Sequence, residues 1–343
     1  MTTLEAVSHV PFEMRYTLPR VEEVFDTPEE IREKQARIRH LCKERNAVLL
    51  SHHYQRSEVQ DVADFVGDSL RLCQAAAATN ADVIVFCGVH FMAETAAVLC
   101  PEKAVLLPDP RAGCSLAASI TAAELCAWKA RFPDAAVVAY INTSAAVKAE
   151  SDYCCTSANA AKVVRAVPES QPILFLPDKF LATVVARQTQ RSNIIAYPGY
   201  CHVHRMIRPE DVIGMLDEHP DIELLLHPEC GCVSSCMAKA LDGGLPADRT
   251  FFLSTEGMLH HIASSSAKEF AVGTELGILH GLRKQHPDRT FYPVNPDAVC
   301  AFMKTITLDR IIASLEELAP QLRVHSDVAV RARRAIDRML QLA

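Results

Sequence analysis

The chain has 343 residues and a formal net charge of -7 at pH 7; 49% of its residues are hydrophobic and 22% are charged. This composition excludes a disordered chain, and the length exceeds one ordinary core, so two or three units of about 100 to 150 residues each are expected. The negative charge, without a stripe of Lys and Arg, argues against nucleic-acid binding, and no run approaches the roughly 20 apolar residues of a membrane span.

The N-terminal sequence and the number of cysteines indicate in which cellular compartment the protein is expected. The first residues lack a basic segment followed by an apolar one, so no export signal is expected and the protein is predicted to be cytoplasmic. The 13 cysteines are an odd number in a large chain, which favours reduced thiols or metal ligands over a disulfide framework. Most of them are expected to pack as small apolar residues.

Residues 27–46 are predicted to form the first helix. Thr27 is suited to cap it, Pro28 occupies its first position, and Glu30 completes a capping box. The preceding residues 1–26 are interpreted as an extension with no assigned role.

After this helix, short apolar runs alternate with amphipathic segments. Near-continuous apolar runs of this kind are typical of buried parallel strands joined by crossover helices, so an α/β fold is predicted. The runs lie at residues 47–54, 82–95, 104–115, 136–144, 173–180, 194–204, 222–230, 250–258, 270–275 and 290–295.

The runs fall into three groups, and each group leads to a cysteine: Cys114, Cys201 and Cys300. Their spacings of 87 and 99 residues suggest one structural unit used three times, although chance spacing among 13 cysteines is an alternative. We predict units at 27–120, 121–205 and 206–343, the last including C-terminal helices. Because ligands bind beyond the carboxyl ends of parallel strands, the three cysteines are expected to converge there.

Polar side chains stand directly after many of these runs, where a purely structural loop would more often carry Gly, Pro or Asn. This placement favours a functional interpretation of the repeat. The residues concerned are His52 and Tyr54, Asp68 and Ser69, Tyr140 and Asn142, Ser144 and Ser157, His227 and Glu229, Ser254 and Thr255, and Thr274 and Glu275.

A second group of cysteines, Cys230, Cys232 and Cys236, lies just after His227 and Glu229. Their C-x-C-x3-C spacing has no second Cys/His pair nearby and is not a standard zinc pattern. Three cysteines that converge from separate units point instead to an iron–sulfur centre, because a [4Fe-4S] cluster with three protein ligands leaves one iron open. An open iron is a Lewis acid that can chelate and polarise a substrate.

Several segments, in order along the chain, closely resemble the quinolinate synthase family. The resemblance covers about residues 28–335 and leaves the N-terminal extension unexplained. It rests on HHYQRSEVQDVADFVGDSL at 52–70, VFCGVHFMAETAAVLCPEKAVLLPDPRAGCSLA at 85–117, YINTSAAVKAESDYCCTSANA at 140–160, LPDK at 176–179, HPECGC at 227–232, STEGM at 254–258 and CAFMKTITL at 300–308.

The resemblance implies a fold of three pseudo-symmetric α/β domains, each a three-layer αβα unit with a parallel sheet, and an active site at their junction. It implies condensation of iminoaspartate (iminosuccinate) with dihydroxyacetone phosphate to quinolinate, phosphate and two waters, in NAD biosynthesis. The implied cofactor is a [4Fe-4S] cluster with one iron open to substrate. A transient contact with the aspartate-oxidising enzyme that supplies iminoaspartate is a further expectation.

The resemblance also assigns roles residue by residue. The cluster ligands are Cys114, Cys201 and Cys300, and the acid/base residues are His52, Tyr54, His227 and Glu229. His53 is expected to point away from their face and to be structural. The implied substrate-binding residues are His52, Ser69, Tyr140, Asn142, Ser157, His204, His227, Glu229, Ser254 and Thr255.

Four cationic or ionisable residues, Lys148, Lys179, His204 and Lys304, are candidates to offset substrate charge, against the alternative of ordinary surface lysines. Ser69 and Ser157 are predicted to open helices whose N-termini favour anions.

Two other functions are alternatives for a chain with these cysteines. An aconitase-type hydro-lyase also uses three cysteines, but it needs a C-x-x-C pair, and this chain has none. A zinc or iron–sulfur sensor using Cys230, Cys232 and Cys236 would need a basic reading helix, which the sequence does not show. Cys300-Ala301 and Met303 also leave no C-x-x-C disulfide at the third ligand, which some relatives have.

Overall fold

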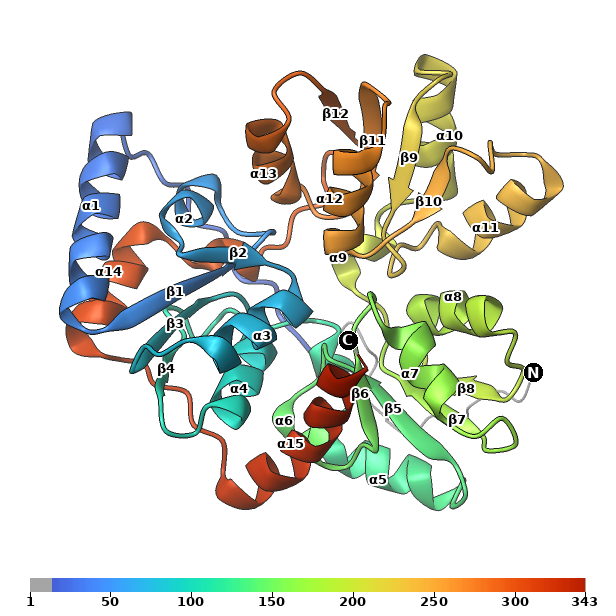
Figure 1. The fold of residues 1–343 in the computed structure, drawn as a ribbon, viewed down its shortest axis with the longest axis horizontal. Coiled ribbons are helices and arrows are strands. Elements are labelled where there is room, and N and C mark those ends of the chain that lie inside the picture. The colour runs from blue at the N-terminus through green and yellow to red at the C-terminus, as the bar shows by residue number, and fades with distance from the viewer. Residues whose placement is uncertain (1–13, 343) are drawn as a thin grey trace.

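The computed structural model describes residues 14–342 and shows three four-stranded, all-parallel sheets (Figure 1). The strand orders are β2-β1-β3-β4, β6-β5-β7-β8 and β10-β9-β11-β12, so the same order recurs in each sheet. The predicted three-domain parallel α/β architecture is confirmed. The boundaries proposed at 120/121 and 205/206 stay predictions, and all strands of one sheet fall inside one proposed unit.

Each sheet is built by strands that alternate with helices along the chain. The first unit contains α1 (Pro28–Glu44), β1 (Ala47–His52), α2 (Ser57–Val62), β2 (Phe65–Gly67), α3 (Ser69–Ala78), β3 (Val83–Cys87), α4 (His90–Leu99) and β4 (Ala104–Leu106). The second contains the short 3-10 helix η2 (Ala117–Ser119), α5 (Ala122–Ala130), β5 (Ala136–Tyr140), α6 (Ala145–Ala149), β6 (Tyr153–Cys155), α7 (Ala160–Ala166), β7 (Ile173–Leu176), α8 (Lys179–Thr189) and β8 (Ile194–Ala196).

The third unit follows the same plan. It contains α9 (His202–Arg205), α10 (Pro209–Glu218), β9 (Glu223–Leu226), α11 (Val233–Asp242), β10 (Thr250–Phe252), α12 (Thr255–Ser264), β11 (Glu269–Gly273), α13 (Ile278–Gln285) and β12 (Thr290–Pro293). The chain ends with η3 (Met303–Thr305), α14 (Leu308–Glu317) and α15 (Ser326–Gln341). The last two helices return to the earlier units, since α14 packs on α1 and α15 packs on α6 and β6.

The local sequence explains most of these elements. All ten predicted strand runs contain a strand, and β3 and β5 are buried along their whole length, as central parallel strands require. The predicted capping box of α1 is present, with the Thr27 side chain accepting from the Glu30 amide. Two strands escaped prediction, β2 and β6, which have three residues each and lie at sheet edges.

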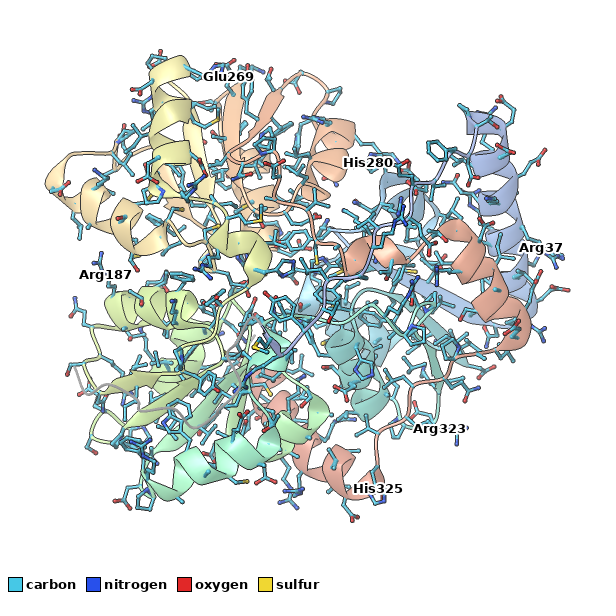
Figure 2. The ribbon with its side chains drawn as sticks, turned by 180° about the vertical axis from the view of Figure 1, so that it is seen from behind. Arg37, Arg187, Glu269, His280, Arg323 and His325 are labelled. Carbon is cyan, nitrogen blue, oxygen red and sulfur yellow. The ribbon has the colours of Figure 1, made fainter. Side chains whose placement is uncertain are left out.

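Several charged side chains lie at the surface, although a few, such as Lys148 and Asp178, are buried. Figure 2 shows labelled side chains such as Arg37, Arg187 and His325 at the periphery of the molecule, away from the sheets. Within residues 14–342, no helix is long and apolar enough to cross a membrane.

Candidate active site

The three sheets are arranged around a common centre (Figure 1). Side chains from all three units line one cavity there. The empty volume of this cavity is about 690 Å³, which includes space open to solvent. The lining residues are His52, Tyr54, Asp68, Ser69, Val89, Phe91, Met92, Gly113, Cys114, Ser115, Tyr140, Asn142, Thr156, Ser157, Cys201, His202, Val203, His204, His227, Glu229, Thr255, Glu275, Cys300, Phe302 and Met303.

Topologically equivalent positions of the three units supply the site. A pair of polar residues two positions apart lies at the end of the first strand of each sheet or directly after it. These pairs are His52 and Tyr54 at the end of β1, Tyr140 and Asn142 at the end of β5, and His227 and Glu229 after β9. The fourth strand of each sheet leads to one cysteine, Cys114, Cys201 or Cys300. The threefold repetition therefore extends from the fold to the site.

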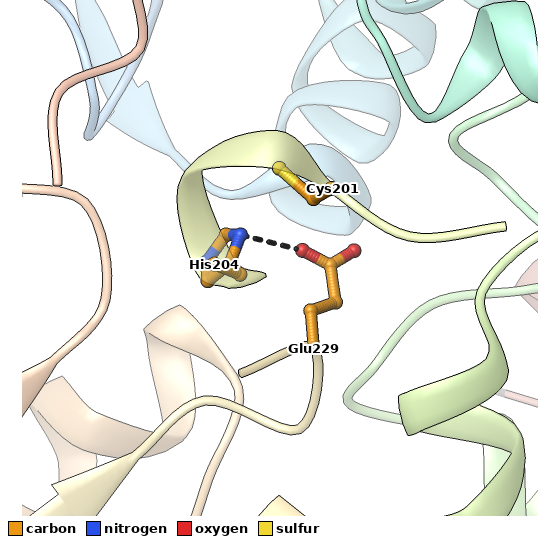
Figure 3. Close-up of side chains that lie close together, drawn as sticks. All are labelled: Cys201, His204 and Glu229. Atoms are coloured by element: carbon orange, nitrogen blue, oxygen red, sulfur yellow. Dashed lines mark ion pairs between the residues drawn. The ribbon is translucent and has the colours of Figure 1, made fainter. Parts of the chain in front are cut away.

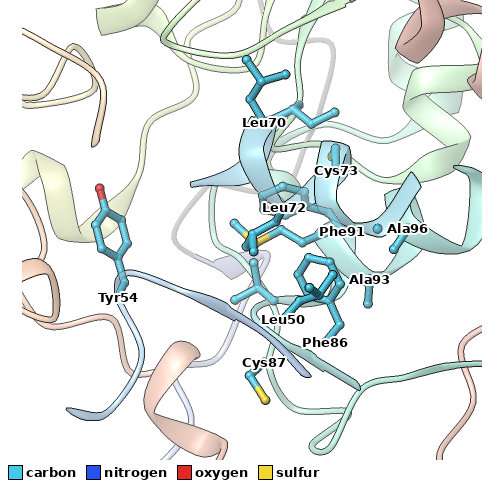
Figure 4. Close-up of a cluster of buried hydrophobic side chains, with 14 of the residues drawn as sticks. Leu50, Tyr54, Leu70, Leu72, Cys73, Phe86, Cys87, Phe91, Ala93 and Ala96 are labelled. Carbon is cyan, nitrogen blue, oxygen red and sulfur yellow. The ribbon is translucent and has the colours of Figure 1, made fainter. Parts of the chain in front are cut away.

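Tyr54 is held just beyond the end of β1. Figure 4 shows its hydroxyl directed away from the apolar side chains that include Leu50 and Phe86. The hydroxyl lies 3.0 Å from Thr255 Oγ1 and 2.6 Å from Thr274 Oγ1. Burial raises the pKa of Tyr54 well above its ordinary value, and the charges of Glu229 and Glu275 add to this. Tyr54 is therefore a neutral phenol that can donate or relay a proton.

His52 is a neutral imidazole of defined tautomer. Its Nδ1 accepts a hydrogen bond of 3.1 Å from the Tyr54 amide, so the ring proton is on Nε2. Burial lowers the pKa of His52 well below its ordinary value, and the neighbouring His53 contributes in the same direction. His53 itself hydrogen-bonds Glu256 at 3.1 Å and does not line the cavity, which agrees with its predicted structural role.

Glu229 is the buried acid of the site. Asn142 Nδ2 donates to its Oε1 at 3.2 Å, and its Oε2 lies 3.1 Å from His204 Nδ1 and 3.7 Å from His227 Nδ1. Figure 3 shows Glu229 and His204 facing each other beside Cys201. Burial raises the pKa of Glu229 to about 7, while a hydrogen bond from Tyr140 opposes the shift. A carboxyl with this pKa can give or take a proton near neutral pH.

The two histidines beside Glu229 are also neutral. Burial lowers the pKa of His227 to about 3 and that of His204 well below its ordinary value. The His204 Nε2 atom lies 3.0 Å from Thr274 Oγ1, and the His227 Nε2 atom lies 3.4 Å from Ser157 Oγ. Thr274 therefore connects His204 to the Tyr54 hydroxyl, which makes one hydrogen-bonded chain across two units.

Glu275 belongs to the site although no motif assigned it a role. Its Oε1 accepts from the Cys300 amide at 3.0 Å and pairs with Lys304 at 3.0 Å, and its Oε2 accepts from the Gly277 amide at 2.6 Å. Glu275 is fully buried and positions the loop that carries Cys300. In the sequence, Glu275 directly follows a buried strand, which indicates a candidate site residue. Residues that only cap a helix or a turn occupy the same kind of position, so the sequence alone does not distinguish Glu275 from them.

Asp178 is a second buried acid, in the LPDK segment. Its Oδ1 caps α8 by accepting from the Leu181 amide at 2.7 Å, and its buried Oδ2 has no hydrogen-bond partner among residues 14–342. Burial raises the pKa of Asp178 well above its ordinary value, and the charge of Glu229 adds to the effect.

The three predicted ligand cysteines fit a shared metal centre. All three line the same cavity, and they are free and only partly buried. Burial raises the pKa of Cys114 to about 12 and that of Cys300 to about 11, and the proximity of the other cysteines contributes to the shift at Cys114 and at Cys201. Thiols that repel each other's charge in this way are suited to a cation that would neutralise them.

A different grouping of ligand atoms shares Cys201. One donor atom from each of Cys201, His204 and Glu229 lies within 4.8 Å of the others (Figure 3). Such a set resembles a mononuclear metal site of mixed ligands. It omits Cys114 and Cys300, so substitution of those two cysteines separates it from a three-cysteine centre.

Some predicted residues are not brought to the cavity. Ser254 caps α12 by accepting from the Gly257 amide at 3.2 Å and does not line the cavity, whereas Thr255 does. Ser69 opens α3 as predicted, but Ser157 does not open a helix, because α7 begins at Ala160.

The lysines proposed to offset substrate charge have other partners. Lys148 is fully buried and donates to the Thr143 carbonyl, and Lys304 pairs with Glu275. Lys179 Nζ lies 5.1 Å from the centroid of the Tyr200 ring. Within the described part of the chain, no lysine or arginine lines the cavity.

The cysteines of the 226–237 segment do not face this cavity. Cys230, Cys232 and Cys236 are buried in an apolar cluster, and Cys230 Sγ donates to the Gly273 carbonyl at 3.0 Å. They pack as the sequence predicted, which leaves His227 and Glu229 as the parts of that segment that reach the cavity.

The chain is similar to known proteins over most of its length. The sequence model described as Quinolinate synthetase A protein matches residues 36–341. A quinolinate synthase from Thermus thermophilus is 55% identical over 300 residues, which cover 88% of this chain and 94% of the relative. Those from Pyrobaculum aerophilum and a Mycobacterium species are each 49% identical, covering 88% and 90% of this chain and 97% and 91% of the relatives. The chain therefore belongs to the quinolinate synthase family.

Proposed function

We propose that this protein is a quinolinate synthase that condenses iminoaspartate with dihydroxyacetone phosphate, releasing phosphate and two waters. The observation that carries the proposal is the convergence of Cys114, Cys201 and Cys300 from equivalent strand ends on a cavity that also holds Glu229 and Tyr54. Family membership supports the same activity. The proposed role is a step in NAD biosynthesis.

In this proposal the three cysteines hold a [4Fe-4S] cluster. When bound through three protein ligands, such a cluster leaves one iron free to polarise substrate oxygen or nitrogen atoms. The Cys300 loop is positioned by Glu275, which accepts from the Cys300 amide and pairs with Lys304.

The substrates are anionic, yet the cavity is lined by neutral donors. The Nε2 proton of His52 and the hydroxyl of Tyr54 are placed to donate to a carboxylate or carbonyl oxygen. Ser69 and Thr255 line the cavity at the first positions of α3 and α12, where their hydroxyls can donate to carboxylate or phosphate oxygens. The Asp68 carboxylate already accepts from the Leu70 and Arg71 amides of α3, and the Ser254 hydroxyl accepts from the Gly257 amide of α12. Neutral donors offset charge less than lysines would, so anion binding is expected to depend partly on the cofactor.

The proton transfers fall to Glu229 and Tyr54. Glu229 is held by Asn142 and has a pKa near 7, so it is suited to take a proton during condensation and return it during loss of water. Tyr54 connects through Thr274 to His204, which provides a path for a proton along neutral groups.

An assay of iron and product tests the proposal. Protein purified without oxygen is expected to contain about four irons per chain and to form quinolinate from the two substrates. Changing Cys114, Cys201 or Cys300 to Ser is expected to abolish iron binding, whereas Cys232→Ser is the matched control. A colourless zinc protein with full activity, or retention of the metal by Cys114→Ser, would favour the Cys201, His204 and Glu229 set instead.

We further propose that iminoaspartate arrives from an aspartate-oxidising enzyme through transient contact, because imines hydrolyse in water. In an assay that couples this chain to the aspartate-oxidising enzyme, the two proteins are either mixed from the start or added one after the other. The quinolinate yield should be lower when this chain is added after the oxidation of aspartate than when it is present during the oxidation. An equal yield in both orders would contradict direct supply.

A further inference from the structure

The segment before α1, residues 14–26, crosses the surface near the three cysteines, and we call it the N-terminal strap. It lies outside residues 36–341, which match the family. Its side chains contact both of the first two units and two of the loops that carry cysteines.

One end of the strap is tied to the second unit through Arg15. The guanidinium pairs with Glu124 through two hydrogen bonds, of 2.8 and 3.1 Å, and also donates to the Ser119 carbonyl. The side chains of Arg15 and Glu124 are only 11% and 16% exposed. A bidentate, largely buried ion pair of this kind fixes the direction of the strap better than a single exposed ion pair.

The other end is tied to the first unit through Glu22. Its Oε1 atom pairs with Arg111 at 3.1 Å and with Arg310 at 2.7 Å. Both arginines also pair with the buried Asp109, so Glu22 joins a network that links the first unit to α14. The backbone carbonyl of Glu22 accepts a further hydrogen bond of 2.7 Å from Arg56.

Tyr16 lies close to the Arg15 tie. Its ring centroid is 5.7 Å from that of His202 and 6.3 Å from that of Phe302, and the latter two are 5.8 Å apart. These three rings form a compact aromatic cluster, which we call the aromatic cover. His202 and Phe302 line the active-site cavity whereas Tyr16 does not, so Tyr16 packs on the side of these rings away from the cavity.

The aromatic cover connects the loops of all three cysteines. His202 follows Cys201, and Phe302 is two residues after Cys300. The Ser115 hydroxyl, next to Cys114, lies 2.7 Å from His202 Nδ1. Tyr16 thus contacts two of the cysteine loops directly and reaches the third through His202.

We propose that Tyr16 is a positioning residue that holds the three cysteine loops together and shields their thiols from solvent on the side away from the substrate cavity. The strap ties at Arg15 and Glu22 keep its ring in place. The shield would serve the metal centre of the proposed function, on which this purpose rests, but the packing itself is a property of the chain.

Thiol labelling tests the packing without relying on the metal. The full chain, treated with a chelator to remove metal, is exposed to iodoacetamide, and the labelling rate of each cysteine is followed by mass spectrometry. Tyr16→Ala is expected to raise the rates at Cys114, Cys201 and Cys300 at least about fivefold. Tyr16→Phe keeps the ring that packs on His202 and Phe302, so its rates are expected to stay below those of Tyr16→Ala. The exposed Cys126 is the internal standard, and its rate should not change.

Phe25→Ala is the matched control, because Phe25 is an aromatic residue of the same strap that is 84% exposed. Equal labelling rates in Tyr16→Ala, Phe25→Ala and the unaltered chain would overturn the proposal. A rate increase in Tyr16→Ala that also includes the deeply buried Cys155 would overturn it too, because it would indicate general unfolding.

A second readout separates this proposal from the proposed function. In the protein purified without oxygen, Tyr16→Ala should lose iron to excess EDTA at least about fivefold faster than Phe25→Ala. If the unaltered chain contains no iron but the labelling pattern holds, the cluster assignment fails and the positioning role of Tyr16 stands. If iron is present and both rates are unchanged in Tyr16→Ala, the positioning role fails alone.

Discussion

Replacing Tyr54 with Phe separates the chemistry of the site from its packing. The substitution removes one hydroxyl, which lies 3.0 Å from Thr255 Oγ1 and 2.6 Å from Thr274 Oγ1, and keeps the ring. A hydrogen bond contributes about 0.5–1.5 kcal/mol net to stability, and Thr274 keeps its contact with His204. The free energy of unfolding is therefore expected to fall by only about 1–2 kcal/mol.

The effect on turnover should be larger. General acid–base groups contribute about 10²- to 10⁴-fold to rate, which corresponds to about 3–5 kcal/mol of activation free energy. Because burial raises the pKa of Tyr54, the phenol is expected to act while protonated, so the remaining activity of Tyr54→Phe should not recover at alkaline pH.

Three measurements on the same preparation decide this. Iron content should be unchanged, and the free energy of unfolding measured with urea should fall by only about 1–2 kcal/mol. Quinolinate formation at saturating substrate should fall at least about 100-fold. Unchanged turnover with an intact metal centre would refute the acid–base role of Tyr54. Loss of iron together with activity would show that the hydroxyl supports the site's structure rather than its chemistry.

Two further substitutions test buried charges by urea unfolding. Asp178→Asn keeps a side-chain oxygen to cap α8 but removes a carboxyl whose pKa is raised by burial. As the pH rises, this carboxyl ionises in the unfolded chain before it ionises in the folded one, which destabilises the unaltered protein. The free energy of unfolding of the variant should therefore exceed that of the unaltered chain by at least about 1 kcal/mol at pH 8 and by little at pH 4. A gain that is equal at both pH values would contradict the ionisation argument. Lys148→Met leaves the Thr143 carbonyl unpaired and should cost about 1–3 kcal/mol, whereas an unchanged midpoint would show that Lys148 does not anchor the loop between Tyr140 and Ser144.

The arrangement of the site also explains why neutral histidines suit this cavity. His52, His204 and His227 are close enough to lower each other's pKa, in addition to the larger effect of burial. Charged imidazoles there would repel one another, and neutral rings can instead act as directed donors and acceptors. Orientation is thus determined by hydrogen bonds such as the one from the Tyr54 amide to His52 Nδ1.

The sequence by itself determined the strands other than β2 and β6, the first helix and the threefold plan. Buried parallel strands leave near-continuous apolar runs, and a capping box is local, so both can be recognised without tertiary information. The cysteines at the end of each group, together with the motif resemblance, were enough to predict many of the residues that line the cavity, from His52 to Cys300, but not Glu275.

Only the tertiary structure decided which polar residues face the cavity. Ser254 and Thr255 are neighbours in sequence, yet one caps a helix and the other lines the cavity. Lys148 and Lys304 are occupied by a carbonyl and a carboxylate, which no local pattern reveals because the partners depend on loop packing. The same holds for Glu275 and for Tyr16, whose contacts join segments far apart in the chain. Periodicity reports the burial of a face, whereas the partner of a polar group depends on how separate units meet.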